Sequence, residues 1–161
     1  MKTTKVVLKS LVVLGAVFAL AACGSKQEST STSTSSSTTE TVVLKDGTYK
    51  AESSKDDYGY KIVHTLTVKD GKISESKFDY EAEDGSLKSA NEEYNKKMKD
   101  KAGVSAGEAI EQLNAALVEK QELSAVEVVS GATHTSEDFK KSAEALLAAA
   151  AEGKTETVKL D

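Results

Sequence analysis

The chain has 161 residues, with 26 acidic and 21 basic side chains and a formal net charge of −5. This acidic balance argues against nucleic acid and against anionic lipid headgroups as partners, because both are bound by clusters of Lys and Arg. A single cysteine excludes an intramolecular disulfide and a cysteine-rich metal site.

The N-terminal segment is typical of an exported lipoprotein. A lysine-bearing start is followed by an apolar run over residues 11–22, which is too short for a stable membrane span and is typical of a secretory signal. The sequence LAAC at residues 20–23 resembles the lipobox of bacterial lipoproteins, in which cleavage exposes a cysteine that carries diacylglycerol. We predict a signal peptide over residues 1–22 and a lipid anchor on Cys23; a buried free thiol is the alternative. Cleavage would leave 26 acids against 18 bases, a net charge of −8.

A low-complexity segment follows the cysteine. Residues 25–41, SKQESTSTSTSSSTTET, contain no aliphatic side chain that could repay the entropy of ordering. We predict that residues 23–41 are the lipidated cysteine and a flexible tether, which would span roughly 20 to 25 Å on average. The folded domain is then expected over residues 42–153, followed by a tail over residues 154–161 that we expect to fray.

Alternating side chains predict a β-hairpin near the start of the domain. A first strand is expected at about residues 48–53. The run over residues 60–68 then alternates clearly and ends in the turn signal KDGK. The side chains expected to share one face of this second strand are Tyr60, Ile62, His64, Leu66 and Val68.

The register of this hairpin follows from the pairing of its apolar residues. A two-residue Asp70-Gly71 turn would set Ile62 opposite Asp79, so the apolar side chain would have no apolar partner across the strands. We therefore predict a three-residue loop with Gly71 left-handed in a bulge. This register sets Tyr60 against Tyr80, Ile62 against Phe78 and Lys61 against Asp79.

Three helices are expected after the hairpin. Ser89 with Glu92 and Ser105 with Glu108 have the spacing of capping boxes, and the third helix is expected to begin near Thr135 or Ser136. Gly103 is expected to end the first helix, and a strand over residues 123–129 to precede the third. The apolar stripes are Ala90, Tyr94, Met98 and Ala102; then Ala109, Ile110, Leu113 and Leu117; then Phe139, Ala143, Leu146, Leu147 and Ala150. The fold class is therefore α+β, a small antiparallel sheet built on a bulged hairpin and packed with about three helices.

The stretch VVSGATHTSEDF at residues 128–139 joins an apolar run to the third helix through small and hydroxylated residues. A helix N-terminus of this kind is a ready anion site, because its first N–H groups lack partners. Gly131 and Ala132 would let a ligand approach the backbone, and the Thr133 hydroxyl would lie beside a bound phosphate. The alternative is a Ser/Thr-rich turn that only caps the helix.

SGATHTS at residues 130–136 resembles the signature of the FMN-binding domain family. That family includes the C subunit of the sodium-translocating NADH:quinone oxidoreductase, the G subunit of the Rnf complex and small surface lipoproteins of Gram-positive bacteria. DGTYKAES at residue 46, TVKDGKI at residue 67 and YNKKMKDKAG at residue 94 are similar in order and spacing to the lipoprotein branch. The resemblance extends from Val42 to about Ala151.

The resemblance implies FMN as the cofactor. In the family a flavin transferase moves FMN from FAD onto the threonine of the motif, and the matching residue here is Thr133. The family motif usually has Asp three residues before the serine, where this chain has Glu127. FMN is then either attached through a relaxed motif or held without the bond. The candidate cofactor-binding residues are Glu127, Ser130, Gly131, Ala132, Thr133, Thr135 and Ser136.

The function implied is a flavoprotein electron carrier, lipid-anchored at the extracellular face of the cytoplasmic membrane. Its expected partners are the flavin transferase, a membrane quinol-linked electron donor and an extracellular electron acceptor. A carrier needs no catalytic base, because the cofactor performs the electron chemistry. The alternative is a non-redox surface lipoprotein, either a binding module or the precursor of a pheromone derived from the signal peptide.

Other candidate groups have simpler interpretations. We expect His64 to be an interior or edge histidine and His134 an exposed loop residue, since neither has a second ligand at metal spacing. Tyr94 and Met98 are expected in the core, although a methionine can also pack on a flavin ring. The acidic residues Glu81, Glu83 and Asp84 lack an EF-hand pattern and indicate a solvated turn. No nucleophile elbow or triad suggests a hydrolase.

Overall fold

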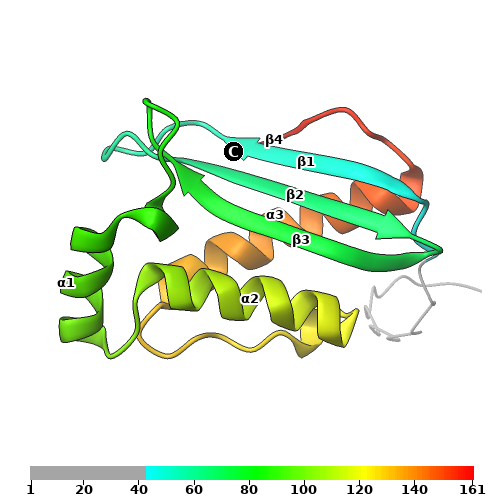
Figure 1. The fold of residues 1–161 in the computed structure, drawn as a ribbon. Coiled ribbons are helices and arrows are strands. Elements are labelled where there is room, and N and C mark those ends of the chain that lie inside the picture. The colour runs from blue at the N-terminus through cyan, green and yellow to red at the C-terminus, as the bar shows by residue number, and fades with distance from the viewer. Residues whose placement is uncertain (1–42) are drawn as a thin grey trace, which may run out of the picture. The chain divides into compact units, whose positions relative to one another are not determined.

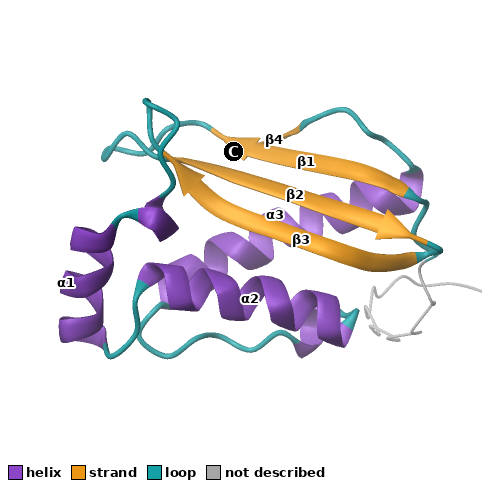
Figure 2. Cartoon of the chain, in the orientation of Figure 1, coloured by secondary structure: helices purple, strands orange, loops and turns teal. Residues whose placement is uncertain are grey.

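The computed structural model describes residues 43–161, so the predicted signal peptide, Cys23 and the tether lie outside the described residues. The described chain forms a four-stranded sheet with helices α2 and α3 against one face, while α1 stands at the end of the sheet where β3 finishes (Figure 1). Figure 2 shows the same arrangement by type of element. The predicted α+β class is confirmed.

The sheet has the order β3-β2-β1-β4. Its strands are β1 (Gly47–Ser53), β2 (Lys61–Lys69), β3 (Lys72–Glu81) and β4 (Val158–Leu160). β1 with β2 and β2 with β3 are antiparallel, whereas β4 runs parallel to β1. The sheet is therefore mixed and not purely antiparallel.

The expectation that the C-terminal tail frays is wrong. Val158 lies opposite Ala51 and Leu160 opposite Ser53, and Leu160 is only 7% exposed. Two apolar residues suffice because the free edge of β1 supplies the backbone partners. The folded domain therefore continues to β4.

The predicted hairpin register is wrong by two residues. Ile62 lies opposite Tyr80, and the turn itself has two residues, Asp70 and Gly71, both with positive φ. The bulge lies further along β3, where the pairing shifts between Thr67 and Val68. His64, Leu66 and Val68 share one face of β2 as predicted, because alternation along a strand does not depend on the register, and that face is buried.

A side chain from outside the hairpin stabilises the two-residue turn. The Asp46 carboxylate accepts hydrogen bonds from the Gly71 and Asp70 amides, each at 2.9 Å. These two bonds lower the pKa of Asp46 below its usual value, and the bond from Gly71 has the larger effect. The pattern within the hairpin could not reveal this contact, because Asp46 precedes β1.

The helices are α1 (Glu92–Ala102), α2 (Ala106–Lys120) and α3 (Thr133–Glu152). The capping box predicted at the start of α2 is confirmed, with Ser105 Oγ accepting from the Glu108 amide at 3.1 Å. The box predicted at Ser89 is wrong. Asn91 caps α1 instead, and Ser89 lies in the short 3-10 turn η1 (Lys88–Ala90). Gly103 ends α1 in the left-handed conformation, as predicted.

The strand predicted over residues 123–129 is absent from the sheet. A 3-10 turn, η2 (Leu123–Ala125), is followed by an extended segment that runs beside α2 (Figure 1). Val126 is buried and the Val129 amide donates to Ser136 Oγ at 3.0 Å. The apolar residues of this segment therefore pack on the helices and not in a sheet.

A polar chain crosses the core between the sheet and α2 and α3. His64 is 1% exposed and lies between Phe78 and Phe139. Its Nε2 is 3.0 Å from Ser76 Oγ and its Nδ1 is 2.8 Å from Ser142 Oγ. His64 is thus the interior histidine that was expected.

The partners of His64 determine its tautomer. Asn114 Oδ1 accepts from the Phe78 amide at 2.8 Å, so the Ser76 hydroxyl donates its proton to the same oxygen. Ser76 then accepts from His64 Nε2–H, and Nδ1 of the neutral ring accepts from the Ser142 hydroxyl, whose oxygen also lies 2.9 Å from the Phe139 carbonyl. Neutral imidazole satisfies this chain, and burial lowers the pKa of His64 to about 3.

Candidate functional site

Thr133 occupies the first position of α3. Its side chain is exposed, and the preceding residue, Ala132, offers no side-chain cap. The first bond of the helical ladder runs from the Ser136 amide to the Ala132 carbonyl at 3.0 Å. The amides of Thr133, His134 and Thr135 therefore precede the ladder, and the Thr133 hydroxyl is accessible beside them.

The small residues before Thr133 are required by packing. Gly131 has φ +82°, and a Cβ placed on it would overlap the carbonyl oxygen of Ala102 at the end of α1. Ala132 is 4% exposed and packs with Val104 and Ala109. Their small size lets the loop pack against α1 and α2, and the approach of a ligand to their backbone stays a prediction.

Thr135 and Ser136 face the interior. Ser136 Oγ donates to the Ala132 carbonyl at 2.9 Å and accepts from the Val129 amide at 3.0 Å. Thr135 is also buried, beside the Tyr80 hydroxyl. These hydroxyl groups hold the loop and the helix start in place, and only Thr133 of the three is accessible to a ligand.

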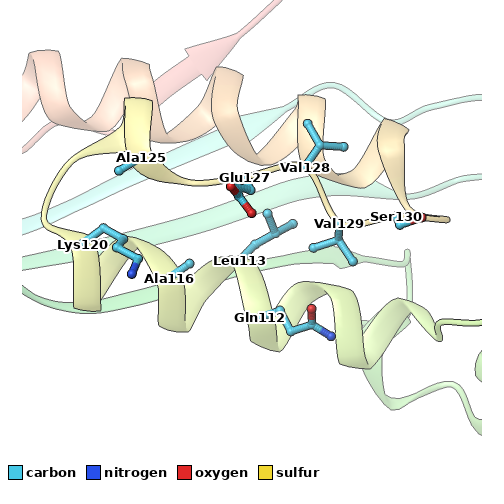
Figure 3. A pocket seen from close by; sticks show the side chains of 9 residues that line it. All are labelled: Gln112, Leu113, Ala116, Lys120, Ala125, Glu127, Val128, Val129 and Ser130. Atoms are coloured by element: carbon cyan, nitrogen blue, oxygen red, sulfur yellow. The ribbon is translucent and has the colours of Figure 1, made fainter.

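Glu127 and Ser130 lie together in a different place, in a groove between α2 and the extended segment (Figure 3). The groove has a volume of about 450 Å³. Thr133 is not among its lining residues, which are Gln112, Leu113, Ala116, Lys120, Ala125, Glu127, Val128, Val129 and Ser130. The structure therefore places the first two residues of the motif beside α2 and Thr133 at the next helix.

A hollow on α1 lies beside the start of α3. It is lined by Tyr94, Met98, Lys101 and Ala102, together with the Lys97 stem, and has a volume of about 320 Å³. Met98 also packs against the group that contains Ala132, directly before Thr133. Tyr94 is 41% exposed, so the prediction that it belongs to the core is wrong. An aromatic ring and a thioether thus form an accessible apolar surface on α1, and the thioether side chain packs beside the residue that precedes Thr133.

Tyr80 connects the sheet to the first turns of α3. Its hydroxyl donates to Asp138 Oδ2 at 2.7 Å, and His134 Nε2 lies 3.4 Å from the same oxygen. Burial, followed by the Asp138 carboxylate, raises the pKa of Tyr80 far above its usual value. The phenol therefore remains a donor at neutral pH. His134 is exposed as predicted, but it lies in the first turn of α3 and not in a loop.

Sequence patterns did not reveal the surroundings of Lys88. Its ammonium lies 4.5 Å from the ring centroid of Tyr80, 5.0 Å from that of Tyr94 and 5.4 Å from that of Tyr60. We name these residues the tyrosine cluster. They come from β3, from α1 and from the residue before β2, so their meeting depends on the hairpin register and on the position of α1.

Two further observations concern residues 43–161. This part of the chain contains no group of three or more His, Cys, Asp and Glu side chains placed to hold a metal ion. Of its helices, none combines the length and apolarity needed to cross a membrane.

Comparison with known proteins identifies the family. Residues 57–148 match the model of the FMN-binding domain. The chain is 33% identical over 116 residues to the 15 kDa lipoprotein of Treponema pallidum (strain Nichols), covering 71% of this chain and 82% of that protein. A Clostridium perfringens protein of known crystal structure shares 43% identity and a TM-score of 0.68, covering 73% of this chain and 99% of the other.

The residues near Thr133 fit FMN chemically. Tyr94 and Met98 offer apolar surface to a planar ring, and Lys101 and the free amides at the start of α3 suit a phosphate. The family match and this set of groups agree. The chain therefore belongs to the FMN-binding domain family, and FMN is its cofactor.

Proposed function

We propose that the protein is a lipid-anchored electron carrier on the extracellular face of the membrane, with FMN phosphoester-linked to Thr133. The observation that carries this proposal is the accessible Thr133 hydroxyl at the first position of α3, within SGAT, in an FMN-binding domain. Bound FMN supplies the reversible uptake of two electrons and one proton. The protein supplies position and environment.

The residues around Thr133 have distinct tasks in this proposal. Thr133 Oγ forms the bond to phosphorus, and the free amides beside it stabilise the phosphate charge. Tyr94 and Met98 would contact the ring, and the buried Ser136 keeps the start of α3 in place. Loss of the Thr133 hydroxyl would therefore remove the attachment and leave the surrounding structure intact.

Attachment requires a flavin transferase. The Thr133 oxygen replaces AMP at the flavin-side phosphorus of FAD, so that one P–O bond forms, the pyrophosphate bond breaks, and the hydroxyl proton is released with AMP. Glu127 and Ser130 lie in the groove beside α2, within reach of an enzyme that approaches this side of the loop. Glu127 stands where the family usually has Asp, and its carboxylate retains the charge that the transferase would recognise.

Anchoring completes the proposal. The lipobox at Cys23 and the Ser/Thr-rich tether would hold the domain near the membrane and let it move between partners. The name of the Treponema pallidum relative, a lipoprotein, supports this arrangement. The proposed partners are a membrane quinol-linked donor and an extracellular acceptor.

The deciding experiment is intact mass spectrometry after co-expression with a flavin transferase. The wild-type protein should gain the mass of FMN less one water, and its flavin fluorescence should stay with the band on a denaturing gel. Thr133→Val removes the nucleophile while keeping the side-chain volume, so the added mass should disappear. Thr48→Val makes the same change at an exposed position of β1 and should leave labelling unchanged.

The variants also separate attachment from binding. If Thr133→Val is folded by circular dichroism and still carries covalent flavin, Thr133 is not the attachment site. If wild-type protein gains no mass but binds free FMN reversibly, the covalent part of the proposal is wrong and the flavin is held without the bond. Glu127→Asp should label at least as fast as wild type.

A further inference from the structure

The backbone beside Lys88 is held in place by hydrogen bonds of the next residue, Ser89. The Asp79 carboxylate accepts from the Ser89 amide at 3.2 Å and also from the Ser89 hydroxyl. Asn95 Nδ2 donates to the Ser89 carbonyl at 2.6 Å. The residue after Lys88 is thus bonded to β3 on one side and to α1 on the other, so the lysine cannot drift with a loose loop.

This cation has an unusual set of neighbours. Lys88 is half-buried, and within residues 43–161 no carboxylate forms an ion pair with it. The faces of the tyrosine cluster stabilise it only in part, because a cation–π contact replaces a fraction of the lost hydration. A partly desolvated cation without a counter-charge attracts any anionic group that binds nearby.

The tyrosine cluster is continuous with the proposed FMN site. Tyr94 belongs both to the cluster and to the hollow on α1. Tyr80 lies under Lys88 and is bonded to Asp138, in the second turn of the helix that begins at Thr133. A flavin ring that packed on Tyr94 would therefore have Lys88 as a neighbouring cation.

We propose that Lys88 raises the reduction potential of the bound flavin. The inference rests on the proposed function and names a positioning residue of that same site. Full reduction adds two electrons and one proton to the neutral ring and so leaves one negative charge on it at neutral pH. Lys88 stabilises this charge and does not stabilise the neutral oxidised ring to the same extent, so the reduced form is favoured.

The size of the effect follows from Coulomb's law. Two unit charges roughly 10 Å apart, at an effective dielectric constant of about 20, change an equilibrium constant on the order of tenfold. Removing the Lys88 charge should therefore shift the equilibrium between reduced and oxidised flavin about tenfold towards the oxidised form. For a two-electron couple this equals a fall of about 30 mV in midpoint potential.

The test is a potentiometric titration with dithionite as reductant and indicator dyes, on flavin-loaded full-length protein. Lys88→Met should lower the midpoint potential, and Lys88→Arg, which keeps the charge, should stay near wild type. Lys96→Met is the matched control, because it removes the same charge from the exposed surface of α1. Circular dichroism checks that each variant is folded, and Lys88→Gln provides a second neutral variant.

The outcomes distinguish the two proposals. If the midpoint potentials of Lys88→Met and Lys88→Gln equal that of Lys96→Met, the lysine acts only as general surface charge. The inference is then overturned, while the proposed electron carrier stands. If wild-type protein loads with no flavin, both proposals fail together. If the midpoint potential of Lys88→Arg falls as far as that of Lys88→Met, the effect comes from the shape of the side chain, and the electrostatic explanation is wrong.

Discussion

The buried histidine makes a quantitative prediction about acid. His64 is neutral in the folded protein, where burial lowers its pKa to about 3, whereas the pKa of a histidine in the unfolded chain is about 6.5. Between these values the unfolded state binds one more proton than the folded state. Stability contributed by neutral His64 is thus complete above pH 6.5 and is lost progressively as the pH falls towards 3.

The magnitude follows from the two pKa values. At pH 5 the solution is about 1.5 pH units below the pKa of histidine in the unfolded chain, so this histidine is protonated there. Its protonation lowers the free energy of unfolding by about 2 kcal/mol. At pH 7 the same term is about 0.2 kcal/mol. Carboxylates also titrate in this range, so the measurement must isolate the histidine.

The assay is urea unfolding of wild type and His64→Gln at pH 7 and pH 5. His64→Gln should be less stable at pH 7, because Ser76 and Ser142 lose the imidazole to which they are hydrogen-bonded. The stability gap between the two proteins should then shrink by about 2 kcal/mol at pH 5, since only wild type has the histidine to protonate. Leu146→Ala keeps His64 and weakens the same core, so its gap from wild type should be equal at both pH values. A gap for His64→Gln that is unchanged within 0.5 kcal/mol, an error typical of such measurements, would refute a neutral buried His64.

Two further outcomes are expected. Gly131→Ala should destabilise the protein by about 3 kcal/mol, since it adds an overlap with the Ala102 carbonyl to the cost of positive φ. Gly85→Ala has the same φ of +82° but nothing within 4 Å, so it should cost only about 1 kcal/mol, and thermal unfolding compares the two. Equal losses of stability in the two variants would show that the loop at Gly131 shifts to accommodate the added methyl group at little cost. Cys23→Ala should leave the melting temperature unchanged and release the protein from membranes, as fractionation and immunoblotting would show; full membrane retention would contradict the lipid anchor.

Local patterns predicted the elements whose causes are local. The inward face of β2 follows from alternation alone, and the capping box of α2 needs only Ser105 and Glu108. The end of α1 at Gly103 is equally local. These features were confirmed because no distant residue competes for the groups involved.

The failures share a different cause, which is competition from residues far away in sequence. The hairpin register depends on Asp46 bonding the turn, and the start of α1 moved because Asp79 engages the Ser89 hydroxyl. For the candidate site, the motif predicted an accessible Thr133, but it could not show that Gly131 is small because of Ala102. The surroundings of Lys88 need three separate elements to meet, so no spacing rule could find them.

The position of β1 determines how the domain bears load. β1 is the first strand after the proposed membrane tether, and it is an inner strand held by β2 on one side and by β4 on the other. Just before it, the Lys45 amide donates to the Ala150 carbonyl at 3.0 Å, and Tyr49 Oη donates to the Lys45 carbonyl at 2.8 Å. A pull on the chain before β1 would therefore load two strand ladders and the end of α3 at once.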